Sequence, residues 1–174
     1  MAVFSVLVCS AALSAQEPNA GKARALVDAA IKMTNSDEAV KLLWQATEID
    51  PSLTEAYVYL GLYYNSREDF PDMVKVYQKL VKYQPDQVSG YLNVAEAYMQ
   101  FSPPHIQDAI PYYRKALQLD PNNAFAALRL GQVLAQNGDR DEAVRYLKQA
   151  QSGAAKNPSV GSEAEKTLRQ MGAL

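Results

Sequence analysis

The stretch from Thr54 to Pro85 decides the fold, and it reads TEAYVYLGLYYNSREDFPDMVKVYQKLVKYQP. Its first half places four residues on one helical face, at positions i, i+3, i+4 and i+7: Tyr57, Leu60, Gly61 and Tyr64. After a polar break over residues 65–70, three residues mark the face of a second helix, which Pro85 ends: Met73, Tyr77 and Leu80. The apolar face of such a helix pair is too wide to bury alone, so the stretch predicts packing against further helix pairs.

The same two patterns recur along the chain. The face of the first helix returns at spacings of 34, 34 and 36 residues, in the sets Ala23, Leu26, Val27, Ala30; Tyr91, Val94, Ala95, Tyr98; and Ala127, Leu130, Gly131, Leu134. The face of the second helix repeats independently, in the sets Ala39, Leu43, Ala46, Pro51; Ala109, Tyr113, Ala116, Pro121; and Ala143, Leu147, Ala150. In the earliest copy we expect helices over about residues 23–33 and 37–49. Two patterns that agree across four copies predict a repeat protein.

A helix-turn-helix period of 34 residues with these face residues resembles the tetratricopeptide repeat (TPR) family. The resemblance covers about residues 20–155. It implies an all-α fold, a right-handed superhelical solenoid of antiparallel helix pairs, with repeats at about 20–53, 54–87, 88–123 and 124–157. We therefore expect a TPR domain over residues 23–158, after a flexible lead-in at residues 16–22. A last helix within residues 159–174, over about 162–171, would cap the solenoid, with Ala164, Leu168 and Met171 on its apolar face.

The first 15 residues, MAVFSVLVCSAALSA, carry no charge and resemble the apolar part of a secretory signal peptide cleaved after Ala15. The stretch is shorter than the roughly 20 apolar residues that span a bilayer. It predicts an exported protein, periplasmic or secreted, and points to the cell envelope. Two alternatives stay open. One is a lipid anchor on Cys9, which Val8 disfavours because a small residue normally precedes a lipidated cysteine. The other is a disordered or membrane-associated tail.

The composition and the lack of known motifs argue against a catalytic, cofactor or metal site in this sequence. The formal net charge is −2, from 17 basic and 19 acidic residues, so nothing favours electrostatic capture of nucleic acid. Cys9 and His105 are the single cysteine and histidine, which predicts no internal disulfide and no metal site. There is no Gly-rich phosphate loop and no nucleophile elbow. We expect no catalytic residues, no cofactor and no metal, so that function lies in the surface.

The TPR resemblance implies a concave groove, lined by the first helix of each pair, that binds a peptide or partner protein. The positions carried over to this sequence are Val58, Leu62, Asn65, Leu92, Asn93, Glu96, Met99, Phe125, Leu128, Arg129, Gln132 and Gln136, with Arg24, Asp28, Ile31 and Lys32 as their equivalents in the first repeat. An apolar stripe edged with amides suits an extended peptide or a helix with apolar side chains. For Leu92 and Leu128, packing against neighbouring helices is an equally open interpretation.

A more specific version of this groove is not expected. TPR domains that bind chaperone tails hold a C-terminal carboxylate with a set of Lys, Asn and Arg side chains. Asn93 and Arg129 match that set, whereas Val58, Leu62 and Phe125 replace its other members. We therefore predict no carboxylate clamp of that kind.

Trp44 stands out because its equivalents in the next three repeats are polar: Gln78, Arg114 and Lys148. This predicts that Trp44 lies on the outer side of its helix. We favour the N-terminal segment folding over it, and the alternative is a second contact patch. The sequence thus predicts a non-catalytic protein-protein interaction module with a partner that it does not identify. The alternative is a self-associating structural subunit or assembly factor of an envelope complex.

Overall fold

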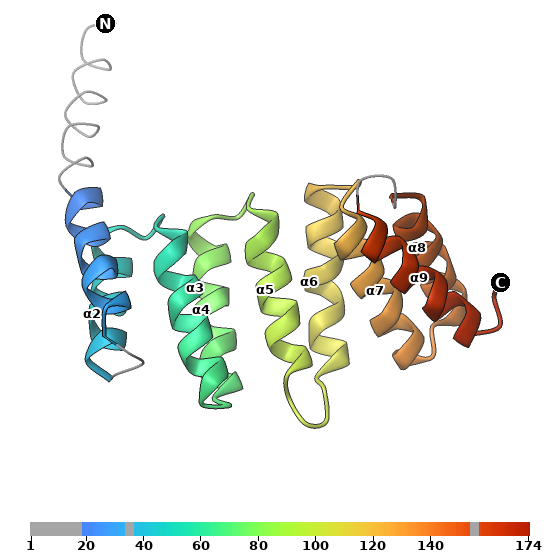
Figure 1. Cartoon of the computed structure of the whole chain (residues 1–174), viewed down its shortest axis with the longest axis horizontal. Coiled ribbons are helices and arrows are strands. Elements are labelled where there is room, and N and C mark those ends of the chain that lie inside the picture. The colour runs from blue at the N-terminus through green and yellow to red at the C-terminus, as the bar shows by residue number, and fades with distance from the viewer. Residues whose placement is uncertain (1–18, 34–36, 154–156) are drawn as a thin grey trace, which may run out of the picture. The chain divides into compact units, whose positions relative to one another are not determined.

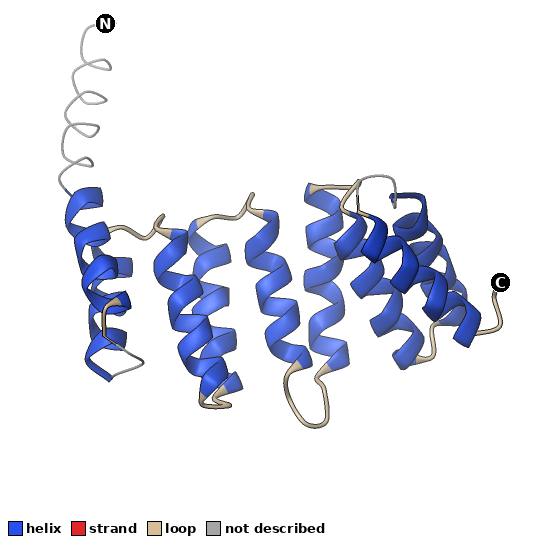
Figure 2. Ribbon diagram, in the orientation of Figure 1, coloured by secondary structure: helices blue, strands red, loops and turns tan. Residues whose placement is uncertain are grey.

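The computed structural model describes residues 19–33, 37–153 and 157–174. All regular structure in these residues is helical, which confirms the prediction of an all-α fold (Figures 1 and 2). Within the same ranges, no helix is both long and apolar enough to cross a membrane. The predicted signal peptide, residues 1–15, lies outside the described residues.

The chain divides between Tyr83 and Gln84 into two compact units, called unit 1 and unit 2 below. The described part of unit 1 consists of a helix over residues 19–31, α2 (Asp37–Ile49), α3 (Thr54–Ser66) and α4 (Phe70–Tyr83). In this unit α2 packs against α3, and α3 against α4. The bounds of α2 are those expected from the sequence. The helix before it requires a correction, because it covers residues 19–31 and not 23–33, so that residues 19–22 of the expected flexible lead-in are helical. Pro71 lies in the first turn of α4, where its missing N–H costs little.

The core of unit 1 is built from the faces that the repeat pattern identifies. Tyr57 and Leu60 of α3 and Leu80 of α4 are fully buried, and so is Val27 of the first described helix. Gly61 permits a close approach between helices, because a Cβ atom there would lie 2.0 Å from the Tyr77 hydroxyl oxygen. The glycine thus allows the Tyr77 ring of α4 to pack directly on the α3 backbone.

Trp44 is partly buried among side chains of unit 1. Its indole N–H donates a hydrogen bond of 3.3 Å to the Tyr64 hydroxyl, and the Lys79 ammonium lies 4.7 Å from the centre of the indole ring. The same ammonium donates to the Thr47 hydroxyl at 3.4 Å. Trp44 thus contacts one side chain of α3 and one of α4. Part of the N-terminal segment that we expected over Trp44 lies outside the described residues, and a role for Trp44 in binding stays a prediction.

Unit 2 contains five helices in its described residues: α5 (Val88–Met99), α6 (Ile106–Leu119), α7 (Ala124–Asn137), α8 (Arg140–Ser152) and α9 (Pro158–Gln170). Neighbours in sequence pack against each other, and α9 packs against both α8 and α7. As expected for its capping helix, α9 buries Ala164 and Leu168 in one core with Tyr113, Leu130 and Leu147.

Local sequence fixes both ends of α7. At its start the Asn123 side chain accepts a hydrogen bond of 2.9 Å from the Ala126 N–H, which satisfies one of the backbone donors left open at a helix N-terminus. At its end Gly138 adopts a left-handed conformation, with φ of 94°, which glycine accepts without strain. These caps hold in place the helix that carries the polar residues discussed below.

Candidate functional site

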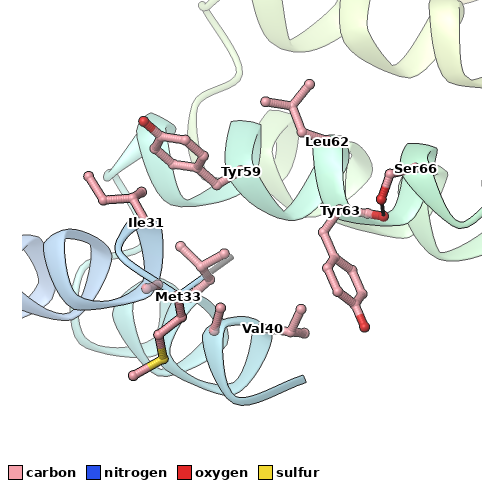
Figure 3. Close-up of a pocket in the computed structure, with 10 residues that line it drawn as sticks. Ile31, Met33, Val40, Tyr59, Leu62, Tyr63 and Ser66 are labelled. Atoms are coloured by element: carbon pink, nitrogen blue, oxygen red, sulfur yellow. Dashed lines mark hydrogen bonds between the residues drawn. The ribbon is translucent and has the colours of Figure 1, made fainter. Parts of the chain in front are cut away.

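An open apolar pocket of about 390 Å³ lies in unit 1 (Figure 3). Its walls come from α2, α3 and the end of the helix that precedes α2. The lining residues are Ala30, Ile31, Met33, Ala39, Val40, Leu43, Tyr59, Leu62, Tyr63 and Ser66. Three apolar side chains at this pocket are among the most exposed in the described chain, namely Ile31 (46%), Met33 (41%) and Leu62 (57%). An exposed apolar cluster of this kind marks a binding surface more often than does a single exposed side chain.

The pocket exists because α3 has two apolar faces. One face carries Tyr57 and Leu60 and is buried in the core. The other is offset by two residues and again follows positions i, i+3, i+4 and i+7, in the set Tyr59, Leu62, Tyr63 and Ser66. Because the core takes the first face, the second remains open to solvent beside α2.

Polar contacts at its edge hold one wall of the pocket. The Tyr63 hydroxyl donates a hydrogen bond of 2.6 Å to the Asp37 carboxylate. Arg67 forms an ion pair of 3.1 Å with the same carboxylate, and its guanidinium lies 4.7 Å from the centre of the Tyr63 ring. The hydrogen bond from Tyr63, with the charge of Arg67, lowers the pKa of Asp37. These contacts join the Tyr63 side chain of α3 to Asp37 at the start of α2.

Two of the groove residues predicted for unit 1 come together at this pocket, Ile31 and Leu62. Val58 is half-buried and Asn65 exposed, and neither lines the pocket. Arg24 lies 3.8 Å from Glu55 in a solvent-exposed ion pair, while the other two first-repeat positions, Asp28 and Lys32, are exposed. Five lining residues belong to neither the predicted groove nor the predicted core faces: Met33, Val40, Tyr59, Tyr63 and Ser66. The repeat register assigned only Val58, Leu62 and Asn65 of α3 to the groove, so it missed their neighbours on the same helix.

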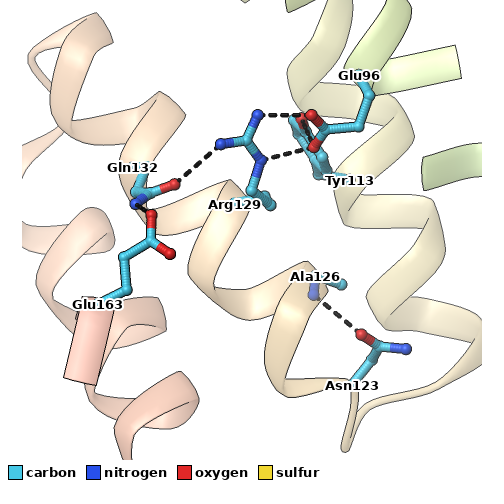
Figure 4. Close-up of polar contacts among 7 residues, drawn as sticks. All are labelled: Glu96, Tyr113, Asn123, Ala126, Arg129, Gln132 and Glu163. Atoms are coloured by element: carbon cyan, nitrogen blue, oxygen red, sulfur yellow. Dashed lines mark hydrogen bonds and ion pairs between the residues drawn. The ribbon is translucent and has the colours of Figure 1, made fainter. Parts of the chain in front are cut away.

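In unit 2 a chain of polar contacts joins four helices (Figure 4). The Glu96 carboxylate of α5 accepts two hydrogen bonds of 2.6 Å from Arg129 of α7, one from Nε and one from Nη2. It also accepts one of 2.6 Å from the Tyr113 hydroxyl of α6. Arg129 Nη1 donates to the Gln132 side chain at 3.2 Å, and Gln132 donates to Glu163 of α9 at 2.9 Å. Two-pronged pairing of Arg with a carboxylate is the strongest hydrogen-bonding arrangement in this set.

The environment keeps the Arg129 guanidinium charged and the Tyr113 hydroxyl protonated. The side chains of Glu96 and Arg129 are each 27% exposed. Burial by itself would lower the pKa of Arg129, but the hydrogen bonds and charge of Glu96 outweigh it and raise that pKa. Burial and the hydrogen bond to Glu96 raise the pKa of Tyr113. Near neutral pH, Tyr113 is therefore a permanent donor to the carboxylate.

The other predicted groove residues of unit 2 divide into three groups. Leu92, Asn93 and Met99 are half-buried, and Phe125 and Gln136 are exposed. Leu128 requires a correction, because its side chain is only 1% exposed and belongs to the core of unit 2. It is buried because α7 packs against α6, α8 and α9. A side chain buried to this extent cannot contact a partner.

A second open pocket, of about 460 Å³, lies between α7 and α9 of unit 2. Its lining is mostly polar: Arg129, Gln132, Ala135, Gln136, Glu163, Thr167, Gln170 and Met171. No cluster of three metal-binding side chains occurs among the residues that the structure describes. The two faces thus offer binding surface, apolar in unit 1 and polar with paired charges in unit 2.

Comparison with known proteins agrees with this fold. Two family models, each described as tetratricopeptide repeat, match residues 55–86 and 105–162, which together make up about half of the chain. Tetratricopeptide repeat protein 21B of the mouse is 25% identical over 143 residues, which is 82% of this chain and 11% of that protein. The chain therefore spans only about a tenth of the length of this curated relative.

Solved structures share the architecture at low sequence identity. The crystal structure of MamA protein matches with a TM-score of 0.68 and 19% identity, covering 89% of this chain and 84% of that one. PcrH, solved in complex with the chaperone binding region of PopD, matches with a TM-score of 0.62 and 20% identity, covering 69% and 91%. Together with the repeated helix pairs and the two family matches, these likenesses lead to one conclusion: the chain belongs to the tetratricopeptide repeat family.

Proposed function

We propose that this protein is a non-catalytic interaction module that holds an apolar segment of a partner protein in the pocket of unit 1. The observation that carries the proposal is the open cluster of Ile31, Met33 and Leu62 beside Tyr63, whose hydroxyl is hydrogen-bonded to Asp37. Burying one large aliphatic or aromatic side chain from water contributes roughly 1.5 to 3 kcal/mol. A pocket of about 390 Å³ lies within the range that proteins use for small apolar ligands.

The form of the partner follows from the shape of the site. The pocket is open along α3, so an apolar side chain can enter while the rest of its segment remains outside. An extended peptide or an amphipathic helix with apolar side chains meets this requirement. PcrH supports this mode of binding, because its structure contains a segment of another protein on a similar fold. The fold leaves the identity of the cargo open.

We extend the proposal to location. The uncharged apolar run of residues 1–15 supports export, and the cell envelope is the compartment in which we place the partner. In the competing function the partner is a second copy of this chain. The exposed Leu62 would then meet a surface of another molecule, and the mass of the purified protein would rise with concentration.

The experiment is affinity capture from an envelope extract, with the chain from Gln16 onward as bait. Leu62→Glu places a charge in the pocket of unit 1, and Phe125→Glu does the same on the exposed face of α7 in unit 2. Tyr83→Glu is the matched control, because Tyr83 is 47% exposed in unit 1 and lies outside the pocket. We expect the bait and the control to retain one partner that Leu62→Glu loses.

Identical sets of captured proteins from the bait and from Leu62→Glu would refute the pocket of unit 1 as the binding site. Loss with Phe125→Glu alone would move the site to unit 2. If only the chain itself is captured, and light scattering shows a dimer that Leu62→Glu dissociates, self-association replaces the adaptor function.

A further inference from the structure

We propose that Met33 is an oxidation site that regulates the pocket of unit 1, with a peroxide as the oxidant. Oxidation of the Met33 thioether to a sulfoxide replaces part of an apolar wall with a polar group, and so weakens binding of an apolar side chain. This inference deepens the proposed function by naming how the site is regulated, and it rests on that function for the role of the pocket.

The first step is that the Met33 sulfur is the most accessible of the methionine sulfurs that the structure describes. Met33 is 41% exposed, whereas Met73 is 8% exposed and belongs to the core. The other two methionines in the described ranges, Met99 and Met171, are half-buried. A dissolved oxidant has to reach a lone pair of the sulfur, so exposure decides which methionine reacts first. Met33 should therefore be oxidised before the other three.

The second step is that Met33 forms part of the pocket wall. It lines the pocket together with Ile31 and Leu62 (Figure 3). Its backbone N–H donates a hydrogen bond of 3.0 Å to the Ala30 carbonyl oxygen, which ties Met33 to the end of the helix over residues 19–31. Among the lining residues, all of which the structure describes, Met33 alone contains sulfur. A mild peroxide acts on sulfur and leaves aliphatic side chains unchanged, so it alters this wall at one atom.

The reaction adds one oxygen atom to the sulfur and removes two electrons from it. A lone pair of the thioether sulfur attacks one oxygen of hydrogen peroxide, so that the O–O bond breaks and an S–O bond forms. The departing hydroxide takes the proton of the transferred OH group, and the products are the sulfoxide and one water molecule. A dithiol-dependent methionine sulfoxide reductase reverses the change, because the oxygen leaves as water while two thiols are oxidised to a disulfide.

The third step concerns what the sulfoxide oxygen meets in the pocket. Two of the three hydroxyl groups in the lining already donate, that of Tyr63 to Asp37 and that of Ser66 to the Tyr63 carbonyl oxygen. The exposed sulfoxide oxygen is therefore hydrated mainly by water. An apolar side chain that enters the pocket has to displace this water and offers no hydrogen bond in return, which lowers its affinity by about fivefold or more.

The test uses the full chain with ¹³C-labelled leucine methyl groups, because the Leu62 methyl signals report on the pocket by NMR. The probe is N-acetylleucinamide, an uncharged compound with one aliphatic side chain. During treatment with hydrogen peroxide, peptide mapping by mass spectrometry follows each methionine separately. We expect Met33 to be oxidised before Met99 and Met171. Its oxidation should weaken the affinity of the probe by about fivefold or more, and treatment with the reductase should restore it.

Met33→Leu is the control, and it is compared with itself before and after peroxide. Its affinity for the probe should not change on treatment, because the pocket then contains no sulfur. The far-ultraviolet circular dichroism of the unmodified protein should also stay the same when Met33 is oxidised, since Met33 lies outside the core. A loss of affinity with an intact fold therefore reports on the pocket alone.

Three outcomes would overturn the proposal. Met99 or Met171 is oxidised first, oxidised Met33 leaves the Leu62 response to the probe unchanged, or peroxide weakens Met33→Leu as much as the unmodified protein. Absence of a Leu62 response before any peroxide is added refutes the pocket as an apolar binding site, and its regulation with it. A response that full oxidation of Met33 leaves intact refutes the regulation and leaves the proposed function standing.

Discussion

Gly61→Ala should destabilise unit 1, against the trend expected for a helix. Gly61 lies inside α3, where replacing glycine with alanine normally stabilises a helix by up to about 1 kcal/mol. Here the new Cβ atom would lie 2.0 Å from the Tyr77 hydroxyl oxygen and 2.2 Å from the ring carbon that bears it. Packing predicts that Gly61→Ala lowers the free energy of unfolding, whereas helix propensity predicts that it raises it. The sign of the measured change shows which effect is larger.

The size of the clash sets the expected magnitude. Carbon atoms in contact sit about 3.5 to 4.0 Å apart, so the end of the Tyr77 ring has to retreat by roughly 1.5 Å. The ring has little room, because Tyr77 is only 5% exposed. Overpacking of this kind costs about 1 to 3 kcal/mol. With a gain of about 1 kcal/mol in helix propensity subtracted, the expected net loss in the free energy of unfolding is up to roughly 2 kcal/mol.

Urea unfolding followed by tryptophan fluorescence measures this loss in the right part of the chain. Trp44 is the only tryptophan, and it lies in unit 1 in contact with Tyr64 and Lys79. Gly21→Ala is the matched control, since no atom lies within 4 Å of a Cβ built there. We expect that substitution to leave the midpoint unchanged or to raise it.

Making Gly61→Ala in a Tyr77→Leu variant separates the clash with Tyr77 from the other effects of the substitution. Tyr77→Leu shortens the opposing side chain, as at the equivalent position in unit 2, where Gly131 faces Leu147. In that background Gly61→Ala should cost less, with a coupling energy of about 0.5 to 3 kcal/mol. A stabilising effect of Gly61→Ala, or an equal cost of Gly61→Ala with Tyr77 and with leucine at position 77, would refute a clash between the new Cβ atom and the Tyr77 ring.

Three further outcomes follow from the ionisable groups. Glu96→Gln removes the charge paired with Arg129 and should cost about 1 to 3 kcal/mol in urea unfolding followed by circular dichroism, less than for a fully buried pair because both side chains stay 27% exposed. Raising the pH from 10 to 12 should lower the free energy of unfolding by on the order of 2 kcal/mol. Burial raises the pKa of Tyr57 to about 12 in the folded protein, so the Tyr57 hydroxyl ionises at lower pH in the unfolded chain than in the folded one. Tyr57→Phe should abolish this part of the loss in fluorescence-detected unfolding. Lowering the pH through about 4 should lower the stability of unit 1. The pKa of Asp37 is lowered in the folded state, so its carboxylate stabilises the fold at higher pH and this stabilisation is lost as the carboxylate is protonated. Asp37→Asn should reduce the loss of stability at acid pH in the same titration.

The helices could be predicted from the sequence because their determinants are local and repeated. The face of α3 is set by residues three and four positions apart, and α2 begins and ends where its pattern does, at Asp37 and Ile49. The last helix was recognised from the spacing of Ala164 and Leu168, and both side chains are buried. Because one pattern occurs in four copies, the clear copies fix the register of the weaker ones, and a single helix offers no such comparison.

The candidate sites were predictable only in part. Leu62 and Ile31 were found from the repeat register, but the pocket also needs Tyr63, which belongs to a second stripe of α3 that the core pattern conceals. The register marked Glu96 and Arg129 separately as groove residues. Their pairing depends on how two helices from different repeats approach and on the rotamers of long side chains, and sequence spacing contains neither.

The position of Leu128 shows a related limit. Its equivalents, Val58 and Leu92, are half-buried, whereas Leu128 is covered because α7 has an additional neighbour in α9. A repeat register assigns the same environment to equivalent residues. Terminal repeats depart from it where a capping helix supplies extra contacts.

Site-specific crosslinking tests most directly whether the pocket of unit 1 holds a segment of a partner. The photoreactive residue p-benzoylphenylalanine is placed at Leu62 in the pocket, and at Tyr83 as the exposed control in the same unit. After irradiation in the cell, we predict one crosslinked product from the Leu62 position, none from the Tyr83 position, and loss of the product with Met33→Glu. No product at Leu62, or the same products from both positions, would contradict the account, and a product with the mass of two copies of this chain would establish self-association in its place.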